Sequence, residues 1–383
     1  MNFDTIRPYD NSEIPAAAAR VAAHPWFEQA VRFLFPESDP GQVRTEFLQL
    51  KSADQLQGGF MLKAFRRILE LTSTSFSPEG IERINPEQRY TFVSNHRDIV
   101  LDAVLLQMML KNSGMETAEV TFGSNLMQDE FIADIGKMNK MFRLVRANEM
   151  HDIRDFYRNS LEVSSYMRYA LLAKRQSLWI AQRNGRTKDG NDRTESALLK
   201  MLALGSGKPF VENMAELNIV PVAVSYEYEP CDFLKVQERY FSLDGHYEKK
   251  REEDLRSIVS GITRPKGGIC IEIMPPVTLP ELHQCDSFGR KQKFETLAHL
   301  IDRRIYGGYR LWKTNYIAAD LRNGTEQYRS MYTPADKDDF ERYMDDGLRQ
   351  LQGEQTRLRR LLLDIYANPV GNCQESTARQ QLF

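Results

Sequence analysis

From residue 90 onward, short apolar runs alternate with longer stretches in which apolar positions recur every three or four residues. The short runs have the length of buried strands, and the recurring positions are typical of amphipathic helices. Strands are predicted at residues 90–94, 118–123, 142–146, 177–182, 217–227 and 268–274, and helices at 97–112, 129–138, 152–173 and 194–205. This alternation predicts an α/β fold with a mostly parallel central sheet flanked by helices.

The two ends of the chain differ from this middle because their patterns are helical. Residues 1–85 are predicted to form a helical region packed on the core, and residues 281–383 a helical extension with one long charged helix over 335–366. The α/β core then covers residues 86–280. An amphipathic helix is predicted over residues 60–71. Its apolar side is expected to pack on the core, and the alternative is that it lies on a membrane surface.

The composition narrows the class of protein. The 383 residues are 42% apolar and 27% charged, which is the balance of an ordinary soluble globule. No apolar run approaches the ~20 residues that span a bilayer, and the first residues lack the pattern of a signal peptide, so a cytoplasmic protein is expected. The four cysteines show no CxxC spacing and the histidines show no ligand spacing, which argues against a disulfide framework and a metal site.

Charge is unevenly distributed along the chain. The formal net charge is −2, yet residues 137–200 hold 14 Lys or Arg against seven Asp or Glu. A basic middle in a near-neutral chain suits an anionic ligand such as a phosphate, and the alternative is a solvated helix face.

The segment YTFVSNHRDIVLD, residues 90–102, places His96 just after an apolar strand and follows it with two carboxylates, Asp98 and Asp102. Open α/β sheets expose reactive groups at the carboxyl ends of their strands. A carboxylate within a turn or two can fix the tautomer of a histidine and raise its basicity. The segment therefore predicts a general base, and the alternative is that the histidine only caps the following helix.

Basic residues follow two further predicted strands. Arg143 and Arg146 belong to the strand FRLVRAN, and the loop QRNGRTKDGND at residues 182–192 carries Arg186 and Lys188 between two glycines. Because the carboxyl ends of parallel strands meet at one edge of a sheet, both segments are expected to lie near the histidine. Cations in a glycine-containing loop suit a phosphate, whereas the alternative is a solvated turn.

Taken together and in this order, these segments resemble the motifs of the glycerolipid acyltransferase superfamily, which includes glycerol-3-phosphate and lysophosphatidate acyltransferases. The family has four blocks: NHxxxxD, an arginine-bearing strand, an EGTR-like loop and a strand that contains a proline. The matching residues, within about 88–277, are Asn95 and His96 with Asp102, then Arg146, then Asn184, Gly185 and Arg186, and last Val220, Pro221 and Val222.

Two departures from the family pattern leave alternatives open. Five residues, rather than four, separate His96 from Asp102, so Asp102 is taken as the partner of the histidine and Asp98 as the alternative. Asn184, or Gln182 if the loop is shifted, stands where the family has a glutamate that is linked to acceptor binding. The identity of the acceptor is therefore open.

The resemblance implies transfer of a fatty acyl group from an acyl thioester to a glycerol-3-phosphate or lysophosphatidate-like acceptor, without a metal or a bound cofactor. The donor would be acyl-CoA or acyl carrier protein, and His96 would be the general base. The residues implied to hold or shape the acceptor site are Arg143, Arg146, Asn184, Gly185, Arg186, Lys188 and Pro221. The implied partners are these substrates and an anionic membrane surface, at the inner face of the cytoplasmic membrane, with no nucleic acid.

Two other functions are compatible with the sequence. An N-acyltransferase that makes an amino-acid-based lipid fits the altered loop at Asn184. A catalytically silent protein that binds lipids or an acyl carrier is also possible on the same fold, but it has no need of a base.

Overall fold

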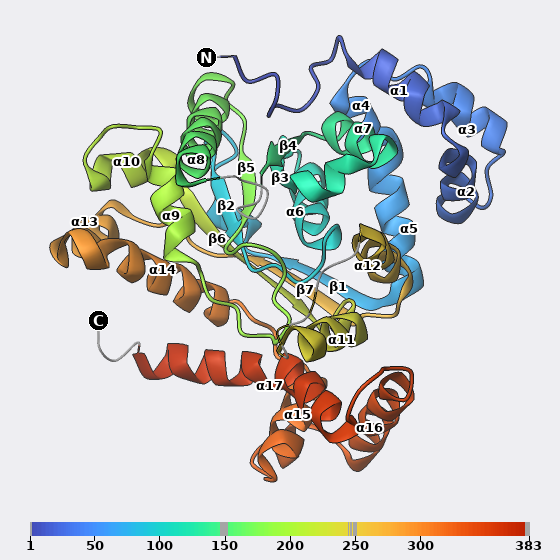
Figure 1. Ribbon diagram of the computed structural model, residues 1–383, viewed down its shortest axis with the longest axis vertical. Coiled ribbons are helices and arrows are strands. Elements are labelled where there is room, and N and C mark those ends of the chain that lie inside the picture. The colour runs from blue at the N-terminus through green and yellow to red at the C-terminus, as the bar shows by residue number, and fades with distance from the viewer. Residues whose placement is uncertain (1, 146–151, 244, 246, 248–250, 380–383) are drawn as a thin grey trace.

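A seven-stranded sheet forms the centre of the molecule (Figure 1). The computed structural model describes residues 2–145, 152–243, 245, 247 and 251–379. The strand order is β1-β7-β6-β2-β5-β3-β4, and β6 and β7 are antiparallel while every other neighbouring pair is parallel. The strands are β1 (Ser73–Glu79), β2 (Thr91–Ser94), β3 (Glu119–Gly123), β4 (Met141–Leu144), β5 (Leu178–Ala181), β6 (Ile219–Tyr226) and β7 (Gly267–Ile273). The predicted α/β fold with a mostly parallel sheet is confirmed.

Each side of the sheet is covered by its own helices, because alternate residues of a strand face opposite sides. Phe92 and Trp179 face the side that is covered by α5 (Leu62–Thr72) and α6 (Leu101–Asn112). Val93 and Ile180 face the other side. The helices on that second side are α8 (Ile153–Arg168), α9 (Ser196–Ala203), α10 (Phe210–Leu217), α13 (Leu279–Ser287) and α14 (Gly289–Gly307).

Two further groups of helices have apolar clusters of their own. The first group consists of α1 (Ile14–Ala23), α2 (Pro25–Leu34), α3 (Pro40–Phe47), α4 (Ala53–Leu56) and α7 (Glu130–Met138). The second lies at the bottom of Figure 1 and consists of α15 (Lys313–Asn323), α16 (Pro334–Leu348) and α17 (Gln355–Arg379), packed on α11 (Asp232–Leu243). The chain ends therefore add helical layers around the sheet.

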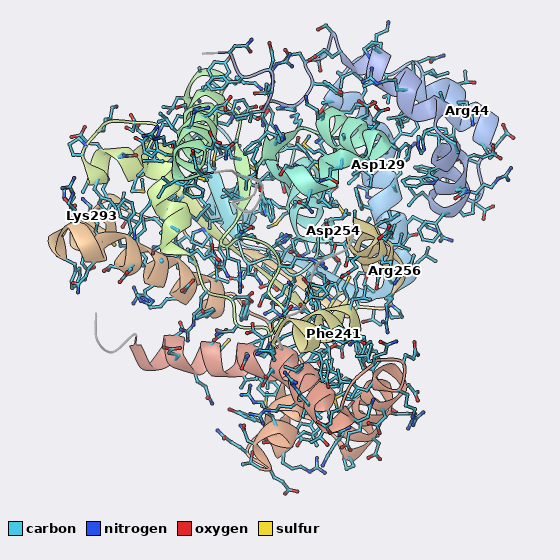
Figure 2. The ribbon with its side chains drawn as sticks, in the orientation of Figure 1. Arg44, Asp129, Phe241, Asp254, Arg256 and Lys293 are labelled. Atoms are coloured by element: carbon cyan, nitrogen blue, oxygen red, sulfur yellow. The ribbon has the colours of Figure 1, made fainter. Side chains whose placement is uncertain are left out.

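One more helix, α12 (Arg251–Thr263), lies beside α5. Figure 2 shows Asp254 on this helix, whose carboxylate accepts a hydrogen bond from Asn125 Nδ2 (2.6 Å). The short turns of the fold are the π-helical η1 (Gln57–Met61) and η5 (Tyr169–Ala173), and the 3₁₀ turns η2 (Ile81–Arg83), η3 (Ser124–Gln128) and η6 (Arg329–Met331).

Two sequence predictions need correction. β1 lies inside the region that was expected to be helical throughout; it is an edge strand, so it needs few apolar residues and tolerates Pro78. The long helix expected over 335–366 is two helices, α16 and α17, which are separated near Gly353 with its positive φ of 140°. The helices α10, α11 and α12 were not predicted.

The amphipathic segment 60–71 packs on the core, as its pattern indicated. Its C-terminal part is α5, and Phe65, Ile68 and Leu69 are buried against the sheet and α6. Lys63 lies on the exposed side of the helix. Among the described helices, none combines the length and the apolar character needed to cross a membrane.

The orientation of α5 can be tested by comparing the free energies of unfolding of two variants. Ile68 and Leu71 are both aliphatic and have the same number of carbon atoms, but Ile68 is 2% exposed and Leu71 is 50% exposed. Ile68→Ala should lower the free energy of unfolding by about 2–5 kcal/mol through the lost contacts and the cavity left behind. Leu71→Ala should change it by less than about 0.5 kcal/mol. Urea titration measures both values, and similar losses for the two variants would show that the helix is turned differently.

Candidate active site

His96 lies in the loop that follows β2, and the neighbouring Asn95 determines how the chain leaves the strand. The side-chain amide of Asn95 pairs with the backbone of β6: Nδ2 donates to the carbonyl of Val224 (2.9 Å), and Val224 N–H donates to Oδ1 (2.8 Å). The asparagine side chain thus takes the place of a further backbone pair. This arrangement directs the chain away from the sheet at His96, at the carboxyl end of a central strand.

Asp102 holds His96 from the first turn of α6. The distance from His96 Nδ1 to Asp102 Oδ2 is 2.9 Å, and the same oxygen accepts hydrogen bonds from the backbone N–H groups of Arg97 (2.6 Å) and Asp98 (2.9 Å). The other oxygen, Oδ1, accepts from the hydroxyl of Tyr226 (2.8 Å). Burial, followed by the charge of Asp102, raises the pKa of Tyr226 well above its usual value, so this hydroxyl keeps its proton and donates.

This geometry determines the tautomer of His96. The side chain of Asp102 is fully buried and acts as the acceptor toward every other partner, so Nδ1 of the histidine carries the shared proton. Nε2 is then left with a lone pair. The side chain of His96 is 15% exposed, and its ring meets the edge of Trp179 at a centroid distance of 5.7 Å. Such a histidine can accept a proton from a bound hydroxyl or amine.

Asp98 has a different role from Asp102. Its Oδ1 accepts from the backbone N–H groups of Val100 (2.9 Å) and Leu101 (2.8 Å), and so caps the beginning of α6. Its Oδ2 is buried without a hydrogen-bond partner among the described residues and lies against Gly261 of α12. Burial, followed by the charge of Asp102, raises the pKa of Asp98. The loop wraps around Asp102, which accommodates the additional residue in the spacing.

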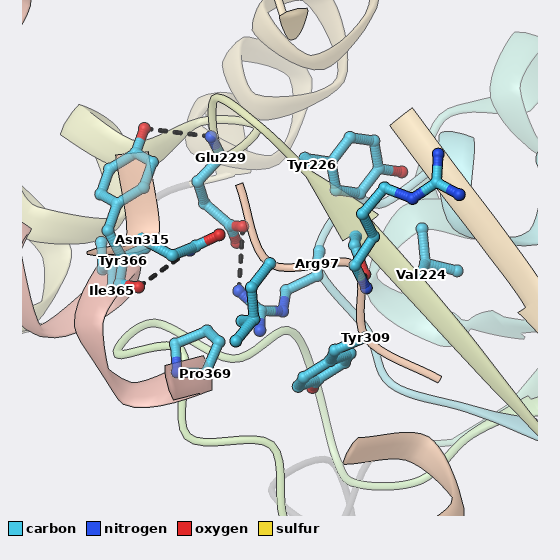
Figure 3. A pocket seen from close by; sticks show the side chains of 12 residues that line it. Arg97, Val224, Tyr226, Glu229, Tyr309, Asn315, Ile365, Tyr366 and Pro369 are labelled. Atoms are coloured by element: carbon cyan, nitrogen blue, oxygen red, sulfur yellow. Dashed lines mark hydrogen bonds and ion pairs between the residues drawn. The ribbon is translucent and has the colours of Figure 1, made fainter. Parts of the chain in front are cut away.

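A cluster of buried charges is built around Arg97, the residue that follows His96; Figure 3 shows Arg97 and Glu229 of this cluster. The guanidinium of Arg97 binds Asp192 (Nε to Oδ2, 2.9 Å) and Glu229 (Nη1 to Oε2, 3.0 Å). Lys235 Nζ binds Glu229 Oε1 (2.5 Å) and the carbonyl of Arg97 (2.7 Å). Burial alone would lower the pKa of Arg97, but the two carboxylates outweigh it and hold that pKa well above its usual value. Tyr309 completes the cluster by donating its hydroxyl proton to Asp192.

The loop at residues 182–192 lies beside His96. Thr187 N–H donates to the carbonyl oxygen of His96 (2.9 Å). Arg186 is 9% exposed, and its Nη1 has no hydrogen-bond partner among the described residues. Its charge lowers the pKa of Asp98, against the larger effects of burial and Asp102, so the cation is electrostatically coupled to this end of the sheet.

The other predicted residues of this loop have different surroundings. Gly185 has a φ of +75°, in the left-handed region that favours glycine. Asn184 is exposed, and its backbone N–H donates to Glu195 Oε2 (3.2 Å). The carboxylate of Glu195 therefore lies beside Asn184, the residue that stands where the resembling family has a glutamate. Gln182 is buried and accepts from the Thr194 hydroxyl (3.3 Å). Lys188 forms an ion pair with Glu238 of α11.

Two predicted residues, Arg143 and Pro221, are not brought to His96 by the described contacts. Arg143 lies on β4, three strands from β2, which corresponds to roughly 14 Å across the sheet. Pro221 is buried in β6 opposite Val93, and therefore on the side of the sheet that Trp179 does not face. Arg146 lies outside the described residues.

Several residues of the site escaped the sequence analysis. Tyr226 is 124 positions from Asp102, and Glu229 is 132 positions from Arg97. Nothing in the sequence links such distant positions. Arg97 could have been noticed, because it lies in the sequence between the expected base, His96, and its carboxylate, Asp102. A cation that is buried at such a position needs an acidic partner. Among the described residues, no group of three or more His, Cys, Asp or Glu is arranged to hold a metal ion.

Comparisons with known proteins give a remote likeness in fold. No family model matches the sequence, and no curated protein matches it. Among solved structures, the chain is similar to the 1-acyl-sn-glycerophosphate (LPA) acyltransferase PlsC from Thermotoga maritima, with 12% identity and a TM-score of 0.39. The match covers 76% of this chain and 95% of that one.

The buried charge of Asp98 predicts a pH-dependent stability difference. Asp98→Asn keeps an oxygen that can cap α6 but removes the charge. Because the pKa of Asp98 is raised above its ordinary value of 3.8 on folding, the wild-type protein loses stability as the pH rises through the raised pKa. Asparagine does not titrate, so the Tm of the variant relative to wild type should be higher at pH 7 than at pH 4. Thermal unfolding followed by circular dichroism measures this, and a difference that shrinks with rising pH would contradict it.

Proposed function

We propose that this chain is an acyltransferase that moves a fatty acyl group from an acyl thioester to a glycerol-3-phosphate or lysophosphatidate-like acceptor. One observation carries the proposal: the His96 ring is held through Nδ1 by a carboxylate that three further donors lock in place, and Nε2 keeps its lone pair. Fixing a base in one orientation is what proton abstraction during transfer requires. The motif order that resembles the glycerolipid acyltransferases supports the same reaction.

The reaction follows from the geometry of this pair. His96 Nε2 takes the proton of the acceptor hydroxyl, whose oxygen forms a bond to the thioester carbonyl carbon. The carbon–sulfur bond then breaks, and the thiolate takes the proton back from the imidazolium. Asp102 stabilises the transient positive charge of the ring and keeps Nδ1 protonated. No covalent acyl-enzyme is needed.

Arg186 is the proposed ligand of the acceptor phosphate. Its guanidinium is mostly buried, has a nitrogen without a partner among the described residues, and belongs to a loop hydrogen-bonded to the His96 carbonyl. An arginine in this state can form charge-assisted hydrogen bonds to a phosphate. Lys188 contributes less in this proposal because Glu238 already neutralises it.

The donor and the location are part of the same proposal. The donor is acyl-CoA or acyl carrier protein, and the enzyme works at the inner face of the cytoplasmic membrane, where lipid acceptors reside. The apolar side of α5 is in the core, so this helix can offer a membrane only its outer side, with Lys63. Attraction of such cations to an anionic surface weakens with salt.

An N-acyltransferase that makes an amino-acid-based lipid is the second candidate. The observation in its favour is the carboxylate of Glu195 at the backbone of Asn184, at the loop position that is linked to the acceptor in the resembling family. A carboxylate there can bind an ammonium group of the acceptor as readily as it can orient a hydroxyl. The base and the donor chemistry are the same in both candidates.

The acyl-transfer proposal can be tested with a panel of acceptors. Purified protein is incubated with labelled acyl-CoA or acyl carrier protein together with glycerol 3-phosphate, lysophosphatidate or amino acids, and the lipid products are identified. His96→Ala should lower the rate by about 10²–10⁴-fold, because it removes the general base. Its Tm should stay near that of wild type, because two backbone N–H groups and the Tyr226 hydroxyl still donate to the Asp102 carboxylate. Activity within a few-fold of wild type would rule out the mechanism, and donor binding without any product would indicate a silent binding protein.

The two carboxylates provide the matched control for this experiment. Asp102→Asn should lower kcat nearly as much as His96→Ala, because an amide cannot stabilise the imidazolium. Asp98→Asn, which keeps the cap of α6, should lower kcat much less. The reverse ranking would transfer the role to Asp98.

A further inference from the structure

The loop that carries Arg186 is held on its other side by the C-terminal helix α17. Asn368 Nδ2 donates a hydrogen bond to the carbonyl oxygen of Asp189 (2.7 Å). Asn368 Oδ1, on the other side of the amide, accepts from Arg322 Nη1 of α15 (2.6 Å). A residue near the end of the chain thus binds the backbone of a loop almost 180 positions earlier, three residues from Arg186.

One residue further on, a proline in α17 makes room for this loop. Pro369 has no N–H group, so it cannot donate to the carbonyl of Ile365, four residues earlier in the helix. Gly190 lies directly against that carbonyl: a Cβ added to it would overlap the oxygen of Ile365. Gly190 also has a φ of +71°, which other residues rarely adopt. The Ile365 carbonyl, which Pro369 leaves without its helical hydrogen bond, is thus the group that Gly190 contacts.

The part of α17 that contacts the loop is itself fixed to the core. The hydroxyl of Tyr366 donates to Asp232 (2.7 Å) and accepts from the backbone N–H of Glu229 (3.0 Å). Asn315 Nδ2 donates to the carbonyl oxygen of Tyr366 (2.8 Å). Figure 3 shows Tyr366 and Pro369 lining the same pocket as Arg97. The helix can therefore act as a rigid support.

The loop is consequently held between His96 and α17. On the inner side, Thr187 binds the His96 carbonyl, and Asp192 binds the guanidinium of Arg97. On the outer side, Asp189 and Gly190 contact α17. Arg186 lies at the beginning of the held segment, so its position relative to the histidine depends on both sets of contacts.

We propose that Asn368 and Gly190 are positioning residues for the acceptor, and that α17 is a structural part of the acceptor site. This inference rests on the proposed function, in which Arg186 binds the acceptor phosphate. Loosening the loop should weaken binding of the acceptor and leave binding of the acyl donor unchanged. A purely structural role would affect both substrates equally or would affect only stability.

The test uses a pair of variants that remove opposite halves of the Asn368 contacts. Asn368→Asp keeps an oxygen for Arg322 but replaces the donor to Asp189. Arg322→Gln removes the Arg322 guanidinium but keeps the hydrogen bond from Asn368 Nδ2 to the carbonyl oxygen of Asp189. Asn368→Asp should raise the KM for the acceptor about three- to tenfold, the effect of losing one hydrogen bond, with the donor KM within twofold of wild type. Arg322→Gln should leave both KM values within twofold.

A second pair of variants tests the glycine contact. Gly190→Ala combines the positive φ with an overlap on Ile365, whereas Gly207→Ala has a similar φ of +69° and no neighbour within 4 Å. Gly190→Ala should raise the acceptor KM, and Gly207→Ala should not, although both cost backbone strain.

Hydrogen–deuterium exchange gives a readout that does not depend on activity. Exchange in residues 183–193 should be faster in Asn368→Asp than in wild type and in Arg322→Gln. If wild type transfers no acyl group, the proposed function fails, while the exchange comparison still tests the support by α17. An unchanged exchange rate, or an acceptor KM for Asn368→Asp within twofold of wild type, would overturn the inference.

Discussion

The structure around the candidate site depends on one buried carboxylate, that of Asp102. An isolated charge in the interior is costly, and this one is compensated by hydrogen bonds from two backbone N–H groups, a tyrosine hydroxyl and the His96 ring. These donors come from the loop after β2 and from the end of β6. The carboxylate therefore fixes the turn into α6, the tautomer of the histidine and the neighbouring strand at the same time.

The buried ion-pair cluster around Arg97 adds further contacts at the same edge of the sheet. Arg97 and Lys235 carry two positive charges, and Asp192 and Glu229 carry two negative ones, so the buried cluster is balanced. Each member comes from a different loop or helix of the carboxyl edge. Because removing one member of a buried pair leaves an uncompensated charge, the loops of this edge are linked to one another. The support that α17 gives to the Arg186 loop extends the same principle to the end of the chain.

The sequence predicted the strands and helices whose apolar residues follow a regular spacing. It did not predict elements and contacts that depend on residues distant in the sequence. The alternation of apolar runs and helices gave the mostly parallel sheet, but β1 escaped because an edge strand is only half covered and includes Pro78. In the site, the spacing favoured Asp102 over Asp98, and the structure brings Asp102 to the His96 ring. Tyr226 could not be predicted, because its contact with Asp102 joins positions 124 residues apart.

The assignment of His96 as the general base can be tested through the protonation state of its ring, measured by ¹⁵N nuclear magnetic resonance on protein labelled in its six histidines. The His96 signals are identified by their loss in His96→Gln. At a pH where the ring is neutral, we expect a protonated Nδ1 and an unprotonated Nε2, with this preference reduced in Asp102→Asn. A neutral ring protonated at Nε2 in the wild-type protein would contradict the assignment of His96 as the general base.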